Sequence, residues 1–136
     1  MDFSAVAPKV FKAVLALDAA AREGLDSVLL ELVQIRASQI NHCTYCLDYH
    51  TRDARAAGES EERIHQVGAW EGSSLFTAEE RAALALTEAV TLLPAGVSDE
   101  VYAAAAQHFG EQELAQLIAL IFTANAWNRM NVTTGK

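Results

Sequence analysis

Two cysteines and a histidine have the residue types and spacing that suit redox chemistry. Cys43 and Cys46 are the only cysteines of the chain, three positions apart, and His50 follows four positions later. Asn41 is a good N-cap, so we expect Cys43 in the first turn of a helix, where free N–H groups and the helix dipole favour a thiolate. Helix geometry places the two cysteine Cα atoms about 5 Å apart, within reach of a disulfide. The motif predicts a pair that can close, with a base one turn away.

The segment before this motif supplies a carboxylate. It is apolar on nearly every side, apart from a narrow polar arc of Ser27, Glu31, Gln34 and Ser38. If the link at Asn41 is a tight antiparallel turn, Glu31 lies roughly 15 Å before it and His50 roughly 13 Å after it, so the two come level. A carboxylate that is half-buried in apolar surroundings suits a general acid or base. We therefore predict one catalytic cluster of Glu31, Cys43, Cys46 and His50.

Several other interpretations compete for the cysteine pair. Zinc has four potential ligands in Glu31, Cys43, Cys46 and His50, although the chain has no second Cys-x-x-Cys. The cysteines also suit inert packing, because free cysteine is among the most buried residue types. Covalent haem attachment requires histidine where Leu47 stands, and a thioredoxin-like enzyme requires a preceding β-strand that the sequence lacks. A dithiol redox site on a helical scaffold is the favoured interpretation, and it needs no cofactor or bound metal.

Helical periodicity and capping residues occur along the whole chain. We expect helices over 7–23, 26–40, 42–57, 60–70, from Thr77 to before Pro94, from Ser98 to Gly110, and from there to about Met130. Thr77 and Glu80 form a capping box. No stretch alternates with the period of a strand. The sequence predicts a single all-α domain over residues 1–136, a bundle of six to seven helices.

Composition and charge narrow the choice of partners. A net charge of -8 and a pI of about 4.9 argue against nucleic acid and anionic membranes, which attract clustered Lys and Arg. The first residues lack the pattern of a signal peptide, and the most apolar stretch, 114–127, is too short to span a bilayer. We expect a soluble, cytoplasmic protein. The apolar last helix suits the interface of a homo-oligomer.

The run from Glu31 to Ile64, with Ala69, Trp70 and LFTAEERAALALTEAV, resembles the alkylhydroperoxidase D core of the carboxymuconolactone decarboxylase-like family. The spacing Glu-x11-Cys-x2-Cys-x3-His is its most specific part. The resemblance implies an all-α fold that assembles into trimers or hexamers, and an antioxidant peroxidase of peroxiredoxin-type activity that reduces organic hydroperoxides. It also implies that Cys46 is oxidised to a sulfenic acid, while Cys43 acts in proton transfer, closes the disulfide and meets a dithiol or protein reductant. Glu31 and His50 then form the proton relay.

One position departs from the pattern of that family. Well-studied members have histidine just before the second cysteine, where this chain has Tyr45. A phenol keeps its proton at neutral pH and does not shuttle protons as imidazole does, so we expect either slower turnover or a relay that rests on Glu31 and His50 alone. Decarboxylase members lack the cysteine pair, which makes lactone decarboxylation the weaker prediction. A helical oligomer that senses oxidants or binds a partner, without turnover, is the alternative from another class.

Overall fold

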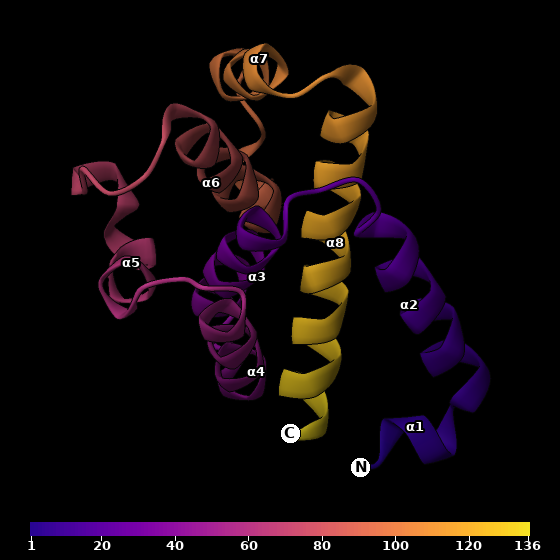
Figure 1. Ribbon diagram of the computed structural model, residues 1–136. Helices are drawn as coiled ribbons and strands as arrows, with labels where there is room; N and C mark the ends of the chain where they lie inside the picture. Colours follow the sequence, from indigo (N-terminus) through magenta and orange to yellow (C-terminus); the bar gives the residue numbers. More distant parts are fainter.

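The computed structural model describes residues 1–136 as helices joined by turns, without a strand, and confirms the predicted all-α fold (Figure 1). The α-helices are α1 (Phe3–Val6), α2 (Pro8–Ala21), α3 (Ser27–Ile40), α4 (Thr44–Ala56), α5 (Glu61–Gln66), α6 (Ala78–Thr91), α7 (Asp99–His108) and α8 (Glu111–Thr134). Two short 3-10 helices, η1 (Val67–Gly72) and η2 (Leu93–Ala95), complete the chain. The predicted helices are all present, and α1, a single turn capped by Asp2, is additional.

Local sequence signals set several helix ends. The capping box of Thr77 and Glu80 opens α6 as predicted, and the Ser98 hydroxyl accepts a hydrogen bond from the N–H of Val101 at the start of α7. Gly24 follows α2 with φ of 76°, a left-handed conformation that glycine adopts without steric cost. These signals act within one turn of the chain, and for that reason sequence reasoning locates them.

Two predicted helix boundaries are wrong. The predicted helix over 60–70 is a short α-helix that gives way to η1, because the backbone at Ala69 is not helical. Gly110 caps the start of α8 instead of ending α7, whose C-cap is Phe109, and α8 continues past Met130 to Thr134. Tertiary packing extends α8 beyond the point where its apolar pattern fades.

The core surrounds α3 and α8, which lie in the middle of the molecule (Figure 1). One apolar cluster joins residues of α3, α6, α7 and α8, namely Leu29, Val33, Ala83, Leu86, Ala105, Leu114, Leu117, Leu120 and Ile121, with Ala21 and Phe109 at helix ends. A second cluster fills the space between α3, α4, α5, η1 and α6. The last helix is thus mainly a core element of the chain.

The helix α2 is held differently from the rest. It packs mainly on α8 and stands apart from the other helices at the right of Figure 1. Only Ala21 is buried in it, whereas Val10, Leu15 and Leu17 are exposed. Both chain ends lie near α1, where the N-terminal amine donates a hydrogen bond to the carbonyl of Thr134. The helix α2 therefore carries exposed apolar side chains.

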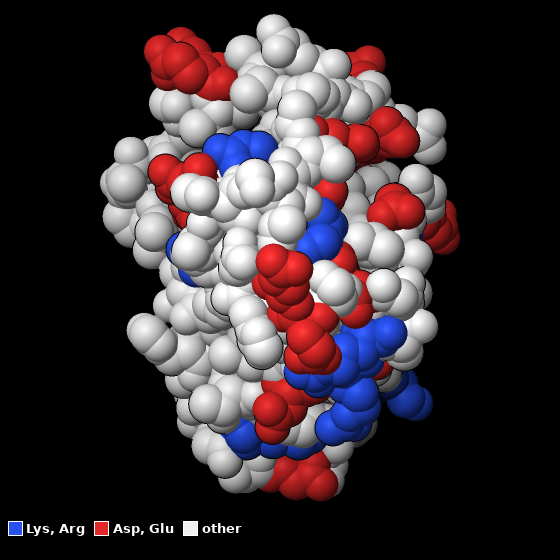
Figure 2. All heavy atoms as spheres, turned by 60° about the vertical axis from the view of Figure 1, so that its left-hand side comes forward, with Lys and Arg blue, Asp and Glu red and all other residues white.

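The surface carries charges of both signs. On the face shown in Figure 2, acidic and basic side chains lie interspersed. Arg63 forms ion pairs with Glu59 and Glu80. Burial opposes the charge of Arg63, but these carboxylates outweigh it and raise the pKa of its guanidinium. No helix is long and apolar enough to cross a membrane.

Candidate active site

The two cysteines form a disulfide at the start of α4. Their Cα atoms are 5.3 Å apart, as helix geometry predicted. The N-cap is Cys43 itself, which corrects the prediction of Asn41, and the N–H of Cys46 donates to the Cys43 sulfur at 3.3 Å. His42 adopts a φ of 54° in the turn, and α4 begins at Thr44, two residues later than predicted. Both sulfurs are thereby held at the positive end of a helix dipole.

The helical hairpin of α3 and α4 brings the predicted carboxylate and base together. His50 Nδ1 lies 2.9 Å from Glu31 Oε2, and both side chains are buried. The two residues thus come level across the turn, as the spacing predicted. His50 follows Cys46 by one helical turn, so the pair of Glu31 and His50 lies beside the cysteines.

An arginine that sequence reasoning missed completes this cluster. Arg22 Nη1 lies 3.9 Å from Glu31 Oε1, while Nη2 donates to Gln34 Oε1 at 2.7 Å. Asp18 accepts from Arg22 Nε at 2.7 Å and from Trp127 Nε1 at 3.2 Å. Arg22 stands just after α2 in the chain, and only its i+4 spacing from Asp18 hinted at a fixed position. The guanidinium places a positive charge beside the carboxylate of Glu31.

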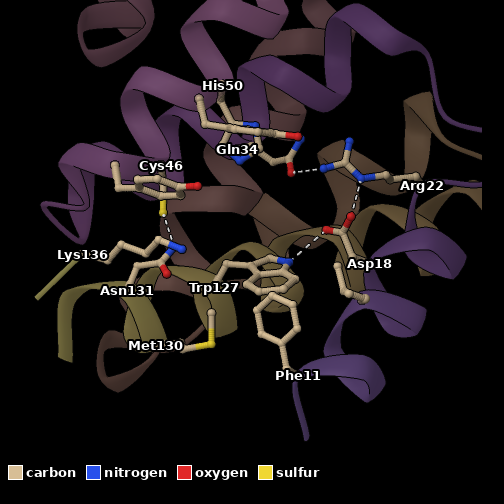
Figure 3. Close-up of a pocket in the computed structure, with 13 residues that line it drawn as sticks. Phe11, Asp18, Arg22, Gln34, Cys46, His50, Trp127, Met130, Asn131 and Lys136 are labelled. Atoms are coloured by element: carbon tan, nitrogen blue, oxygen red, sulfur yellow. Dashed lines mark hydrogen bonds and ion pairs between the residues drawn. The ribbon is translucent and has the colours of Figure 1, made fainter. Parts of the chain in front are cut away.

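A cavity of about 230 Å³ opens onto this cluster (Figure 3). Its lining consists of Phe11, Leu15, Asp18, Arg22, Gln34, Tyr45, Cys46, Tyr49, His50, Trp127, Met130, Asn131 and Lys136. Cys46 contributes its sulfur to the wall, whereas Cys43 is 0% exposed and does not line the cavity. The structure therefore makes Cys46 the cysteine that a small molecule meets.

The wall opposite the sulfur is apolar and comes from α2 and α8. Phe11 and Trp127 pack edge to face with ring centroids 5.5 Å apart, and Leu15 and Met130 lie on the same cavity. Trp127, Tyr45 and Tyr49 all line the cavity. An organic molecule finds here both an apolar surface and a sulfur atom.

Tyr45, the departure from the family pattern, lies at the edge of the cavity. Its side chain is half-exposed, and the ammonium group of Lys136 lies 4.9 Å from the ring centroid. It has no hydrogen bond to Glu31 or His50, so the phenol stands outside the pair that would move the proton. The other histidines, His42, His65 and His108, do not line the cavity.

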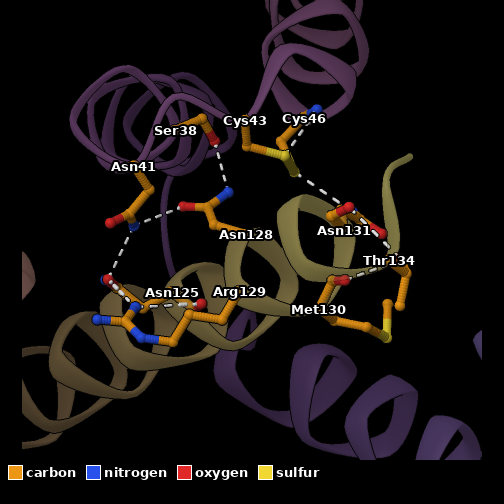
Figure 4. Close-up of a disulfide and its surroundings, with 10 residues drawn as sticks. All are labelled: Ser38, Asn41, Cys43, Cys46, Asn125, Asn128, Arg129, Met130, Asn131 and Thr134. Carbon is orange, nitrogen blue, oxygen red and sulfur yellow. Dashed lines mark hydrogen bonds between the residues drawn. A yellow bond between two sulfur atoms is a disulfide. The ribbon is translucent and has the colours of Figure 1, made fainter.

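A row of buried asparagines on α8 holds the turn that carries the cysteines (Figure 4). They are Asn125, Asn128 and Asn131. Asn41 Nδ2 donates to the first two at 3.0 Å each, and Asn128 Nδ2 donates to Ser38 Oγ at 3.0 Å. Asn131 Nδ2 donates to the Cys46 sulfur at 3.4 Å. Sequence reasoning missed Asn131; the signal was three asparagines spaced by three in an apolar helix.

Metal binding finds little support in this geometry. No group of three or more His, Cys, Asp or Glu side chains is arranged to hold a metal ion. The zinc alternative needed the sulfurs of Cys43 and Cys46 as separate ligands, and here they are bonded to each other. The disulfide lies next to a hydrogen-bonded histidine and carboxylate.

Similarity to known proteins agrees with this fold. Residues 8–89 match the Carboxymuconolactone decarboxylase family. The uncharacterized protein YdfG of Bacillus subtilis is 35% identical over 137 residues, which cover 99% of this chain and 93% of YdfG. The chain belongs to the carboxymuconolactone decarboxylase family.

Solved structures define the fold more closely. A protein of unknown function from Agrobacterium tumefaciens, with a suggested role as the antioxidant defence protein AhpD, superposes with a TM-score of 0.94 at 33% identity, over 98% of this chain and 92% of that one. The debrominase Bmp8, crystallised with 2,3,4-tribromopyrrole, has a TM-score of 0.86 at 19% identity, over 97% and 72% of the two chains. The fold is AhpD-like, and the same fold serves at least one enzyme.

Proposed function

We propose that this protein is a thiol peroxidase that reduces organic hydroperoxides in antioxidant defence. The observation that carries the proposal is the Cys43–Cys46 pair, whose second sulfur lines a half-apolar cavity beside the hydrogen-bonded Glu31 and His50. The suggested antioxidant role of the similar Agrobacterium protein agrees with it. The apolar wall suits the organic part of a hydroperoxide, and the sulfur suits its peroxide group.

In the oxidative half of the reaction, Glu31 and His50 move protons, Cys46 attacks the hydroperoxide and Cys43 closes the disulfide. Glu31 and His50 accept the proton of the Cys46 thiol, and the thiolate attacks an oxygen of the hydroperoxide. The O–O bond breaks, the alcohol leaves after protonation by the same pair, and Cys46 becomes a sulfenic acid. The Cys43 thiol then loses its proton, its sulfur attacks the Cys46 sulfur, and the hydroxyl group leaves with that proton as water. The product is the disulfide present in the structure.

Two of the remaining side chains assist this sequence. The amide of Asn131, 3.4 Å from the Cys46 sulfur, stabilises a negative charge there by hydrogen bonding. Arg22 keeps the Glu31 carboxylate in place through its contacts with Glu31 and Gln34. The disulfide is reset by a dithiol or protein reductant. We also propose a homo-oligomer, a trimer or hexamer, because the exposed apolar side chains of α2 favour burial in an interface.

The test is turnover of cumene hydroperoxide with dithiothreitol as reductant. We expect activity in the wild type and none in Cys46→Ser, because serine forms no comparable nucleophile. Cys43→Ser should complete one oxidation and then stop at the sulfenic acid. Full activity of Cys46→Ser would contradict the assignment.

Thiol titration separates the remaining alternatives. One equivalent of cumene hydroperoxide should remove both thiols of the reduced protein, without bound zinc. Two protected thiols with one zinc would indicate a metal site, and two thiols that the peroxide leaves unchanged would indicate inert packing. Loss of both thiols without turnover in dithiothreitol would indicate a sensor instead of an enzyme.

A further inference from the structure

A second cavity, of about 390 Å³, adjoins the cavity of about 230 Å³ that Cys46 lines. It lies between α1 and the end of α8, with Phe3 and Thr134 in its lining. The two cavities share the side chains of Phe11, Met130, Asn131 and Lys136. The first cavity alone is smaller than the roughly 300–1,000 Å³ of typical small-molecule sites, and together the two fall within that range. An elongated molecule can therefore extend from the Cys46 sulfur into the second cavity.

The wall that the two cavities share has an apolar part and a positive charge. Phe11 and Met130 form the apolar part, and Lys136 lies on the same side of the first cavity as Cys46 and Asn131 (Figure 3). The ammonium group of Lys136 lies 4.9 Å from the ring centroid of Tyr45 and forms no ion pair. A free cation beside apolar side chains suits a ligand that has both a hydrocarbon chain and an acid group.

The backbone at the end of α8 fixes the place of Lys136. Gly135 has a φ of 75°, and its N–H donates to the carbonyl of Val132 at 3.4 Å. The N–H of Lys136 donates to the carbonyl of Asn131 at 2.9 Å. These two bonds form a Schellman motif, in which the chain turns back against the last turn of the helix. The motif holds Lys136 beside the helical turn whose Asn131 contacts the Cys46 sulfur.

The carboxylates that line the two cavities are already bound to protein groups. Asp18 in the first cavity accepts a hydrogen bond from Arg22 Nε at 2.7 Å. Asp2 in the second cavity accepts from the Ser4 hydroxyl at 2.7 Å and from the N–H of Ala5 at 3.2 Å. Each cavity has only this one Asp or Glu in its lining. The ammonium group on the shared wall is therefore available to the acid group of a ligand.

We infer that the hydroperoxide is an aliphatic carboxylic acid whose peroxide group lies at Cys46 and whose carboxylate pairs with Lys136. This inference rests on the proposed function and names its substrate class. The hydrocarbon chain packs on Phe11 and Met130, and the second cavity holds the part of the chain beyond them. Cumene hydroperoxide occupies the first cavity alone and has no acid group for Lys136.

The first experiment measures binding without a peroxide. Decanoate is added to the oxidised protein, and binding is followed by the fluorescence of Trp127, which lines the first cavity. Lys136→Gln should weaken binding of decanoate about five-fold, the upper range for a partly exposed ion pair, and leave binding of 1-decanol unchanged. Lys12→Gln, on α2 outside both cavities, is the matched control. Absence of decanoate binding, or equal binding to Lys136→Gln, would overturn the inference.

The second experiment fills the second cavity. Thr134→Trp adds bulk to a residue that lines it, and Val132→Trp is the control, exposed on the same helix outside both cavities. With linoleic acid hydroperoxide, kcat/KM should fall about ten-fold in Thr134→Trp and stay unchanged in the control, because contacts remote from the reacting atoms are lost. With cumene hydroperoxide, both variants should equal the wild type.

A matched pair on α1 repeats this test if Thr134→Trp does not fold. Ser4→Trp fills the second cavity from the other side, and Val6→Trp is the exposed control on the same short helix. Linoleic acid hydroperoxide should lose kcat/KM only in Ser4→Trp. Unchanged kcat/KM for this substrate in the cavity variants would overturn the inference.

The two proposals fail separately. Binding of decanoate that depends on Lys136, in a protein that reduces no hydroperoxide, contradicts the proposed function alone. In an active peroxidase, Lys136→Gln should lower about five-fold the ratio of kcat/KM for linoleic acid hydroperoxide to that for its methyl ester. An unchanged ratio contradicts only the inferred substrate class.

Discussion

The two central helices bury side chains of opposite character on their different sides. Toward the core, α3 and α8 present leucine, valine and isoleucine, namely Leu29, Val33, Leu117, Leu120 and Ile121. Toward the cysteine helix and the cavity they bury Glu31, Gln34, Ser38, Asn125, Asn128 and Asn131. Both sides are equally removed from solvent, so burial alone does not distinguish the core from the site.

The apolar and polar sides of α3 and α8 differ in how precisely their contacts fix the positions of atoms. Apolar burial stabilises in proportion to area and is non-directional, so the apolar side holds the helices together without fixing single atoms. Hydrogen bonds fix distance and angle, and a buried polar group that loses its partner is costly. The apolar side therefore sets the stability of the fold, and the polar side sets the positions of Cys46, His50 and Glu31.

The largest predicted effect is on the apolar side. Leu117→Ala should lower the free energy of unfolding by about 3 kcal/mol, because it removes a fully buried side chain and leaves a cavity. Urea unfolding followed by circular dichroism measures this, with Phe122→Ala on the exposed side of α8 as a control of small effect. The alkylation rate of Cys46 in the folded variant should be unchanged. A large change in that rate would contradict the claim that the apolar side sets stability while the polar side sets the positions of the site residues.

The second largest predicted effect follows from loss of the Glu31 carboxylate. Glu31→Gln should slow oxidation of the reduced protein by cumene hydroperoxide about 100-fold, because the amide does not accept the proton that the carboxylate does. Stopped-flow tryptophan fluorescence measures the rate, and Glu23→Gln, the same change at an exposed position, is the control. Unfolding in urea should be nearly unaffected. A rate equal to that of the wild type would remove Glu31 from the proton relay.

A smaller effect should follow from the asparagine that holds the turn. Asn128→Ala should lower the free energy of unfolding by about 2 kcal/mol, since Asn41 and Ser38 lose a buried partner. The double variant Ser38→Ala/Asn128→Ala should cost less than the sum of the two single variants, because both remove the same hydrogen bond. Full additivity in urea unfolding would show that this bond contributes little.

The smallest effect concerns the sulfur itself. Asn131→Ala should reduce the rate at which iodoacetamide alkylates Cys46 at neutral pH by about ten-fold, through loss of a hydrogen bond to the thiolate. The measurement uses a Cys43→Ser background, so that one thiol reacts, and Thr133→Ala on the exposed side of α8 is the control. An unchanged rate would assign Asn131 to packing alone.

Sequence reasoning reached the parts of this site that lie within one helix or one hairpin. The spacing of Cys43 and Cys46 fixed their separation, and counting along two helices placed Glu31 opposite His50. It did not reach Asn131, which is 85 positions from Cys46, or Arg22, which stands beyond the end of α2. It also misplaced the N-cap, because the side chain of Asn41 bonds to α8 instead of capping α4.

The sequence by itself determined the all-α fold, the helix caps at Thr77 and Ser98, and a cysteine pair beside a histidine and a carboxylate. These follow from periodicity and from interactions within a few turns, which the covalent chain enforces. Only the tertiary structure decided which sulfur faces the cavity, that α8 is a core helix, and that Asn131 and Arg22 belong to the site. The register of one helix against another depends on how side chains from distant segments pack and pair, and no local pattern encodes it.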